Sequence, residues 1–306
     1  DQRIRTAKTG DWWTTNPERA LANNSVAYSD KPDAGIFMKE WLSLYESKSG
    51  ERGIFNRASA QKKAAENGRR ESHWDFGTNP CSEIILRPNQ FCNLTEIVVR
   101  AGDTINTLTR KIKVATLLGT IQSTFTNFGY LRKVWQDNTE EERLLGVSLT
   151  GIMDSELLNG KETGLAKTLE KLKKVAVDCN KEYAEKFNIN QSTAITCVKP
   201  SGTVSQLVDS ASGIHARHNP YYIRTVRGDK KDPLTEFLKA SGIPSEDDKM
   251  KPDHTTVFSF PMMAPKGSVC RTDMTAIQQL EMWKIYAKHW CEHKPSVTIS
   301  VKEEEW

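Results

Sequence analysis

The chain has 306 residues, of which 37% are hydrophobic and 27% are charged, and its formal net charge is +4. This composition is typical of a globular protein with a sizeable core and excludes a disordered or fibrous chain. The positive charge is weak and dispersed, and no segment approaches the ~20 apolar residues that cross a bilayer. We therefore expect neither a nucleic acid nor a membrane as a partner.

The first third of the chain predicts short elements joined by turns. Apolar residues at positions 36, 37, 41, 42 and 45 have helical spacing, so residues 34–46 predict a helix. The stretch "SKSGERG" ends that pattern before a second, basic helix at about 56–68. Gly77 and Pro80 mark a loop, and a long helix follows Asp103, with Asp103 or Thr104 as its cap.

The remaining two thirds alternate between strand and helix patterns. The stretch "LLGVSLTGIMD" at 144–154 predicts a buried strand that ends in a glycine turn, and residues 162–187 predict a helix. The β-branched stretch "STAITCV" predicts a strand that enters a Pro-Ser-Gly-Thr turn. Further strands are expected at "YYIRTVRG", "TTVFSFPM" and "SVTISVKE", with helices at 233–241 and 273–292. This alternation favours a parallel α/β architecture.

The six cysteines lie at positions 81, 92, 179, 197, 270 and 291, and no pair has the CxxC spacing. They are too sparse for a disulfide framework, so we expect free thiols in a reducing cytoplasm. Each thiol is then structural or catalytic. Cys179 and Cys270 lie on or beside expected helices and are interpreted as packing residues.

The stretch "NPCSE" at 79–83 places a thiol and a carboxylate two residues apart. In an extended loop, residues i and i+2 project to the same side, so Asn79, Cys81 and Glu83 could reach one ligand together. A carboxylate beside a substrate hydroxyl can act as a general base, and Cys92 supplies a second sulfur nearby in sequence. The alternative is a buried structural cysteine with a solvated glutamate.

The stretch "KPSGTVS" at 199–205 carries a second candidate site. Successive backbone N–H groups, the hydroxyls of Ser201, Thr203 and Ser205, and a helix N-terminus would together bind an anion. The spacing is not that of a Walker A loop. The alternative is a plain strand-to-helix turn.

Two other groups of polar residues are weaker candidates. His289 and His293 flank Cys291 at i and i+4, but no further cluster with ligand spacing completes a zinc site, so no metal site is predicted. Four basic residues follow the anion-binding turn and could contact an anionic ligand or form a surface loop: His215, Arg217, His218 and Arg224.

Taken together, these stretches resemble the catalytic α/β barrel of a ribonucleotide reductase, in particular the adenosylcobalamin-dependent class II branch with its phage members. The resemblance is carried by "NPCSEI" at 79–84, Cys92 eleven residues after Cys81, "RLLGVSLTG" at 143–151, "PSGTVS" at 200–205 and "GIHARHNPYYIRTVR" at 213–227. It spans essentially all of the chain. It implies a single domain, residues 1–306, that is part of a ten-stranded barrel of the type shared with glycyl radical enzymes.

The resemblance also implies an activity, a cofactor and a role for each site residue. The activity would be reduction of ribonucleotides, expected to be triphosphates, to 2′-deoxyribonucleotides for DNA precursor synthesis, with adenosylcobalamin as cofactor. At the tip of a finger loop, Cys81 would be the transient thiyl radical that takes the ribose 3′-hydrogen, and Glu83 would exchange the 3′-hydroxyl proton. Asn79 would bind a ribose hydroxyl, and Cys92 would be half of a reducing dithiol. The substrate phosphates would lie on Pro200, Ser201, Gly202, Thr203, Val204 and Ser205.

The expected partners are the ribonucleotide and a dithiol reductant such as thioredoxin or glutaredoxin, in the cytoplasm, or the host cytoplasm if the protein is viral. No cysteine precedes Cys81 to pair with Cys92, and the C-terminal cysteine pair of the family is missing. We therefore expect a fragment that needs the N-terminal and C-terminal parts of the enzyme and is inactive alone. Two alternatives are a class I chain served by a separate radical subunit and a non-catalytic nucleotide-binding fragment. The residues do not distinguish diphosphate from triphosphate substrates.

Overall fold

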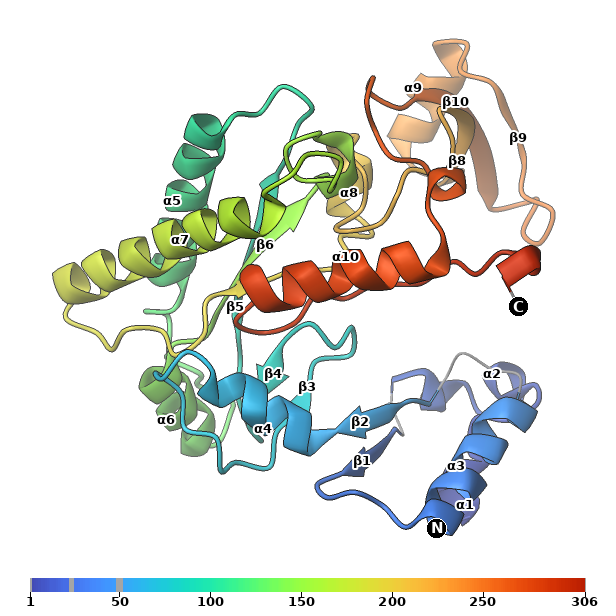
Figure 1. Ribbon diagram of the computed structural model, residues 1–306. Helices are drawn as coiled ribbons and strands as arrows, with labels where there is room; N and C mark the ends of the chain where they lie inside the picture. The colour runs from blue at the N-terminus through green and yellow to red at the C-terminus, as the bar shows by residue number, and fades with distance from the viewer. Residues whose placement is uncertain (1, 22–24, 48–51, 306) are drawn as a thin grey trace.

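A parallel three-stranded sheet lies at the centre of the molecule in the computed structural model, which describes residues 2–21, 25–47 and 52–305 (Figure 1). Its strand order is β5-β6-β7. The strands are β5 (Asn93–Val98), β6 (Leu145–Thr150) and β7 (Thr196–Cys197). Every residue of β6 is buried, as expected for the middle strand of a sheet that is covered on both faces.

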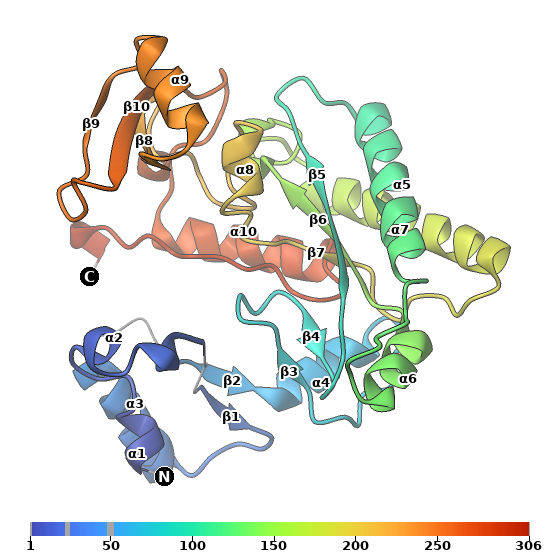
Figure 2. The same cartoon turned by 180° about the vertical axis from the view of Figure 1, so that it is seen from behind.

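Long helices pack beside this sheet and enclose the main core (Figures 1 and 2). The helices are α5 (Ile105–Gln122), α7 (Leu165–Phe187) and α10 (Ala276–His289). Helix α5 begins at a capping box. The Thr104 side chain accepts from the Thr107 N–H, and the Thr107 side chain accepts from the Thr104 N–H. Strand β6 ends at Gly151, whose φ of 81° belongs to the left-handed region that favours glycine. The expected cap and the expected glycine turn are both confirmed.

A small antiparallel hairpin, which we call the finger hairpin, carries the "NPCSE" stretch at its tip. It consists of β3 (Gly77–Thr78) and β4 (Ile85–Leu86), which follow α4 (Arg57–Ala65) in the chain. Helix α6 (Lys133–Glu142) comes later in the chain, after α5. Arg70 fixes its base, since its guanidinium donates to the Ile85 carbonyl at 2.9 Å and pairs with Glu142 at 2.9 Å. Both ion-pair partners are buried, so losing either would leave an unpaired charge in the core at the base of the hairpin.

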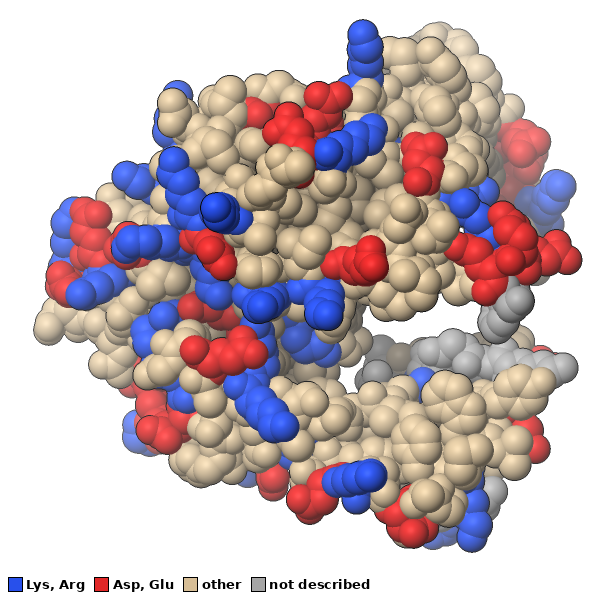
Figure 3. Space-filling view, viewed as in Figure 1, with Lys and Arg blue, Asp and Glu red and all other residues tan. Residues whose placement is uncertain are grey.

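The chain forms two smaller units on either side of an opening that is visible in Figure 3, where acidic and basic side chains are interspersed. The N-terminal unit contains α1 (Gln2–Arg5), α2 (Trp12–Thr15), α3 (Ala34–Ser47) and the parallel pair β1 (Val26–Tyr28) and β2 (Ile54–Asn56). The C-terminal unit contains β8 (Tyr221–Asp229), α9 (Pro233–Ala240), β9 (Ser245–Asp247) and β10 (Thr255–Met263). The remaining helices are the short α8 (Val204–Leu207) and 3₁₀ turns at Pro17–Leu21, Ile152–Asp154, Arg271–Asp273 and Glu303–Glu305.

The fold is mixed α/β, but two expectations about its strands are wrong. The sheet β8-β10-β9 is antiparallel, so the parallel arrangement applies to the central sheet and to the β1–β2 pair but not to the C-terminal unit. Residues 296–302 form no strand, because side chains rather than a neighbouring strand bind part of their backbone, as when His215 accepts from the Thr298 N–H at 2.9 Å. Among the described residues, the four sheets are small and none closes into a barrel.

Candidate active site

The tip of the finger hairpin is a tight turn rather than an extended loop. The Asn79 carbonyl accepts from the Ser82 N–H at 2.9 Å, and the Asn79 side-chain oxygen accepts from the Ile84 N–H at 3.0 Å. Ser82 has a φ of 63°, which breaks the alternation of side chains. The expectation that residues 79, 81 and 83 form one extended row is therefore wrong. Asn79 retains only its side-chain N–H₂ group for a ligand.

This turn separates the environments of Cys81 and Glu83. The Cys81 thiol is exposed, whereas Glu83 is only 2% exposed. The Glu83 Oε2 atom is buried and has no hydrogen-bond partner within the described residues. An unpaired buried carboxylate oxygen costs free energy unless a ligand supplies a donor. Desolvation and the Glu83 charge raise the pKa of Cys81, so this thiol is protonated at neutral pH.

Cys92 lies immediately before β5 and close to the same carboxylate. Burial raises the pKa of the Cys92 thiol far above its usual value, and the charge of Glu83 adds to that effect. Because the Glu83 charge acts on both Cys81 and Cys92, the structure brings the three residues into one electrostatic neighbourhood. Both thiols are held in the S–H form.

A third thiol, that of Cys197 on β7, is buried; burial raises its pKa, and the neighbouring Cys92 and Glu83 add to that effect. Its neighbour on β6 is Ser148, whereas Cys92 precedes Asn93, the partner of Leu145. The two cysteines are thus two strand spacings apart, about 10 Å, and several residues apart along the strands. A disulfide requires Cα atoms within about 7 Å, so this arrangement does not pair Cys92 with Cys197.

The anion-binding turn, residues 200–205, follows β7 directly. Ser201 has a φ of 57°, and its buried Oγ has no hydrogen-bond partner among the described residues. The backbone N–H groups of Gly202 and Thr203 likewise make no hydrogen bond in the described part of the chain. Helix α8 has only four residues, so the expected help from a helix N-terminus is small. What the turn offers an anion is its own set of N–H and hydroxyl donors.

Lys199 connects this turn with the central sheet. Its backbone N–H donates to the buried Ser148 Oγ at 2.8 Å, and its ammonium lies 3.3 Å from the Glu96 carboxylate. The Lys199 charge also lowers the pKa of Cys81, although less than burial and Glu83 raise it. The Lys199 ammonium therefore acts on the Cys81 thiol at the finger tip through its charge.

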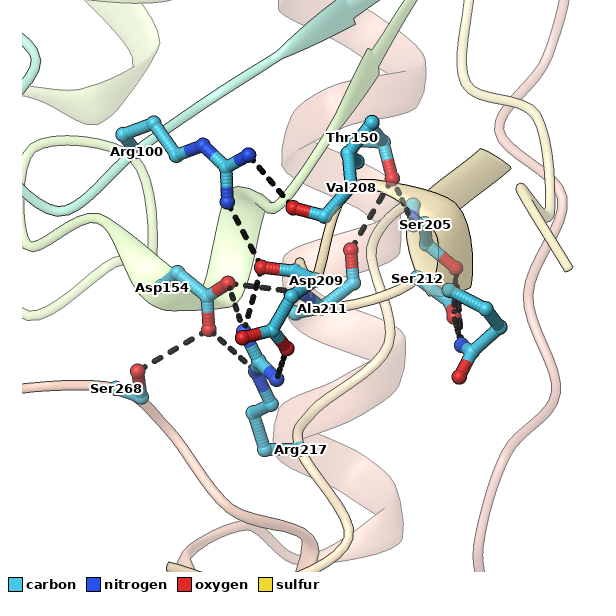
Figure 4. A network of polar contacts seen from close by, with 12 residues as sticks. Arg100, Thr150, Asp154, Ser205, Val208, Asp209, Ala211, Ser212, Arg217 and Ser268 are labelled. Carbon is cyan, nitrogen blue, oxygen red and sulfur yellow. Dashed lines mark hydrogen bonds and ion pairs between the residues drawn. The ribbon is translucent and has the colours of Figure 1, made fainter. Parts of the chain in front are cut away.

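A buried polar network supports the turn from behind (Figure 4). Arg217 and Asp154 form an ion pair at 2.8 Å, and both side chains are 2% exposed. Asp154 also accepts from the Ala211 N–H at 2.8 Å, and Thr150 Oγ1 accepts from the Gly213 N–H at 2.9 Å. These bonds fix the segment that follows α8 against the end of β6.

The network decides the roles of the four basic residues that follow the turn. Arg217 is committed to Asp154 and Asp209, and the ring nitrogens of His215 bind the Ser212 carbonyl and the Thr298 N–H, so neither is free for an anion. All four residues line a cavity of about 890 Å³ that also includes Gly202, and His218 and Arg224 are the two of them that are not held by bonds to Asp154 or to the backbone. In the described part of the chain, no acidic residue lines this cavity, which fits an anionic ligand.

The histidine pair near the end of α10 has separate structural roles. His289 Nδ1 lies 2.7 Å from Glu170, whereas His293 is buried in bonds to the backbone. No group of three or more His, Cys, Asp or Glu residues within 2–21, 25–47 and 52–305 could hold a metal ion. No helix in these ranges is both long and apolar enough to cross a membrane.

No family model matches the chain. The adenosylcobalamin-dependent ribonucleoside-triphosphate reductase of Lactobacillus gasseri is 29% identical over 258 residues, which cover 75% of this chain and 34% of that protein. The protein of the same name from Euglena gracilis is 27% identical over 305 residues, covering 95% of this chain and 40% of that protein. The chain thus spans about a third to two fifths of the length of the curated relatives it matches.

A crystal structure of a B12-dependent, class II ribonucleotide reductase superposes on all of this chain and on 46% of its own, with a TM-score of 0.78 and 23% identity. This likeness shows a shared fold. In sequence, the chain is similar over part of their length to proteins named adenosylcobalamin-dependent ribonucleoside-triphosphate reductases.

The structure places three polar residues near the candidate site that the sequence analysis does not single out. These residues are Asp154, which pairs with Arg217, and Lys199, which pairs with Glu96. Each pair joins segments that are far apart in the chain, so no sequence spacing reveals it. The one available signal is the position of Lys199 directly before the anion-binding turn. His293 carries a sequence signal, but the signal suggests a metal face that the fold does not form.

Proposed function

We propose that this chain is the part of an adenosylcobalamin-dependent ribonucleotide reductase that reduces ribonucleoside triphosphates to 2′-deoxyribonucleotides by thiyl-radical chemistry. One observation carries the proposal. A buried, unpartnered carboxylate oxygen of Glu83 lies two residues from the exposed, protonated thiol of Cys81, and residues 200–205 offer a turn of N–H donors without partners among the described residues. The curated relatives, which are named as triphosphate reductases, support the same activity.

The chemistry assigns separate tasks to the residues of the finger tip. Cys81, as a thiyl radical, takes the ribose 3′-hydrogen atom and returns a hydrogen atom after reduction. Glu83 Oε2 accepts the 3′-hydroxyl proton, because it has no competing protein donor. Asn79 binds a ribose hydroxyl through its N–H₂ group, since its oxygen already holds the turn.

The reduction itself needs two electrons and two protons. Cys92 supplies one thiol, and a second thiol from outside the matched region supplies the other. The 2′-hydroxyl leaves as water with one proton, carbon C2′ gains a hydrogen, and the two sulfurs end as a disulfide. Burial of Cys92 keeps its thiol protonated, which suits a group that must deliver a proton. A dithiol protein of the thioredoxin or glutaredoxin kind, in a reducing cytoplasm, would restore the pair.

The phosphates of the substrate bind the turn formed by Pro200, Ser201, Gly202, Thr203, Val204 and Ser205. The N–H groups of Gly202 and Thr203 and the buried Ser201 hydroxyl are donors without partners in the described residues. The polar network around Asp154 and Arg217 holds the turn in place before the ligand arrives.

The residues present fit adenosylcobalamin, because radical generation at a cysteine needs an accessible thiol in its protonated form. Cys81 is exposed, and its pKa is raised by partial desolvation of the sulfur and by the charge of Glu83. When bound, this cofactor supplies the radical chemistry that side chains lack. The protein contributes the placement of the thiol at the finger tip and the environment that keeps it protonated.

We further infer that residues 1–306 are one domain, part of a ten-stranded α/β barrel. Its other strands would correspond to segments that the longer relatives carry outside the part matched by this chain. In the described residues, β5 pairs only with β6, so its outer edge is open. Exposed apolar side chains of α5 flank this edge, including Val114 and Leu118, beside a cavity of about 830 Å³. An open edge beside an apolar groove fits an additional strand, which would bring the second thiol next to Cys92.

The decisive test is Cys81→Ser in a complete enzyme that joins this chain to the segments its relatives carry beyond it. We expect turnover to fall below detection while binding of the ribonucleotide is unchanged, because the oxygen of serine does not form a comparable radical. Cys179→Ser is the matched control, since Cys179 lies on α7 away from the site. Turnover retained in Cys81→Ser would refute the catalytic role. In the unsubstituted complete enzyme, activity that needs a separate radical subunit instead of adenosylcobalamin would favour class I, and ribonucleotide binding without any turnover would favour a non-catalytic fragment.

A further inference from the structure

Residues 290–296 connect the central sheet with the finger hairpin. The Glu292 and His293 N–H groups both donate to the Thr196 carbonyl at 3.0 Å, and the Ser296 N–H donates to the Val198 carbonyl at 2.9 Å. Val198 returns a bond to the Lys294 carbonyl at 3.2 Å. The segment thus runs beside β7 on the side away from β6, and its side chains lie between the sheet and the hairpin.

The His293 side chain spans this space. Its ring is fully buried, Nε2 lies 3.0 Å from the Leu145 carbonyl on β6, and Nδ1 lies 3.3 Å from the Ile85 backbone nitrogen on β4. A carbonyl can only accept and an N–H can only donate, so the ring is neutral with its proton on Nε2. Both ring nitrogens are used, which leaves His293 no role in proton transfer to a ligand.

The next residue adds a second bond to the same part of the hairpin. The Lys294 N–H donates to the Glu83 carbonyl at 3.0 Å. Consecutive residues of the segment therefore hold the backbone on both sides of Ile84, one through the Glu83 carbonyl and one through the Ile85 N–H. Cys81 lies only two residues further along the turn.

We propose that His293 is a positioning residue that holds the finger tip, and with it the Glu83 carboxylate and the Cys81 thiol, in a fixed position against the segment 290–296. This inference rests on the proposed function, because it assigns the finger tip its role. A misplacement of about 1 Å at a reacting group costs on the order of 10²-fold in rate. The anion-binding turn has its own support at Asp154 and Arg217, so substrate affinity does not depend on His293.

Two substitutions separate the two bonds of the ring. In His293→Asn, the amide oxygen lies near the position of Nδ1 and still accepts from Ile85, whereas the bond to Leu145 is lost. In His293→Gln, the amide nitrogen reaches the position of Nε2 and still donates to Leu145, whereas Ile85 loses its acceptor. The proposal expects the bond to Ile85 to matter for the finger tip and the bond to Leu145 to matter mainly for packing.

The first measurement is hydrogen–deuterium exchange of the 306-residue chain, which needs no cofactor. We expect His293→Gln to speed exchange at residues 83–86 by at least tenfold and His293→Asn to leave it near that of the unsubstituted chain. The second measurement is turnover by the complete enzyme. We expect kcat to fall roughly 10²-fold in His293→Gln with KM unchanged, and His293→Asn to recover at least tenfold of that loss.

Two results would overturn the proposal. One is unchanged exchange at residues 83–86 in His293→Gln. The other is an equal loss of kcat in both variants that follows their loss of thermal stability, because this is what a packing role predicts. Failure of the proposed function is distinguishable, since the unsubstituted complete enzyme would then not reduce ribonucleotides although exchange at residues 83–86 still depended on His293.

Discussion

The finger tip and the anion-binding turn are both tight turns built around a serine with positive φ, 63° at Ser82 and 57° at Ser201. They differ in what holds them. The finger tip is anchored by the His293 ring, which accepts from the Ile85 N–H, and by the Lys294 N–H, which donates to the Glu83 carbonyl, whereas the anion-binding turn is supported by the ion pair of Asp154 and Arg217.

They also differ in what they present to a ligand. The finger tip presents a protonated sulfur and an unpartnered carboxylate oxygen, which are groups that move hydrogen atoms and protons. The anion-binding turn presents N–H groups and a hydroxyl, which are groups that hold negative charge in place. Similar backbone geometry thus serves reaction in one region and binding in the other, and substitutions should affect kcat in the first and KM in the second.

The largest effect is expected for Glu83→Gln in the complete enzyme. Glutamine keeps the shape of the side chain but cannot take up the 3′-hydroxyl proton, so kcat should fall roughly 10²- to 10⁴-fold with little change in KM. The pKa of Cys81 should also fall part of the way, because one of its two raising influences is removed. Steady-state kinetics and the pH dependence of thiol alkylation measure the two effects.

Glu246→Gln on the exposed strand β9 is the control and should change neither quantity. A kcat for Glu83→Gln within threefold of the unsubstituted enzyme would rule out general-base work by this residue.

The second effect concerns the support of the anion-binding turn. Asp154→Asn leaves the buried Arg217 guanidinium with only the half-exposed Asp209 as a counter-charge, so the free energy of unfolding should fall by about 3 kcal/mol. In enzyme that remains folded, KM should rise more than kcat falls. Urea denaturation gives the first quantity and kinetics the second.

An exposed pair provides the comparison for Asp154→Asn. Asp178→Asn breaks the Lys174–Asp178 pair on α7 and should cost at most about 1 kcal/mol. If Asp154→Asn lowers kcat at unchanged KM, the assignment of reaction to the finger tip and of binding to the anion-binding turn is wrong.

The sequence predicts the elements of this molecule better than it predicts how they meet. Local signals suffice for the cap at Thr104 and for the helix at residues 105–122, because the bonds that decide them lie within a few residues. The residues of both turns are also recognisable from their spacing. The bond between His293 and Ile85 is not, because 208 positions separate its partners and only the folded chain brings them together.

The histidine spacing near the end of α10 shows why a local pattern can mislead. Residues at i and i+4 share a face only while the helix continues. Helix α10 ends at His289, so His293 lies outside the helix and its side chain turns into the core. In the same way, the alternation rule fails at the finger tip because Ser82 adopts a left-handed conformation that the sequence does not announce.

The third effect is a pH dependence of stability that comes from His293. Burial, with the nearby Arg70 and Lys63 charges, lowers the pKa of His293 from 6.5 to about 3. Between these values the unfolded chain binds a proton that the folded chain does not, so stability falls as the pH drops from about 6.5 towards 3, by about 1.4 kcal/mol per pH unit. Above pH 6.5 both states are neutral at this position, and the contribution disappears.

Urea denaturation at several pH values measures this slope, and His293→Asn provides the reference. Asparagine does not titrate, so the stability of the variant should fall less steeply on acidification than that of the unsubstituted chain. Carboxylates act on both proteins alike and cancel in the difference. Parallel pH curves for the two proteins would contradict a buried, neutral His293.

The smallest effect on stability is expected at Ser201, and it tests most directly whether the anion-binding turn acts in binding alone. Ser201→Ala removes a buried hydroxyl that has no partner in the described residues, so the free energy of unfolding should change by less than about 1 kcal/mol. Ser201→Gly should be at least as stable as Ser201→Ala, because glycine adopts a φ of 57° without strain. If the hydroxyl binds a substrate phosphate, both variants raise KM several-fold and leave kcat unchanged. A loss of kcat instead would mean that this turn also controls the reacting groups, and the separation between a binding turn and a reacting turn would not hold.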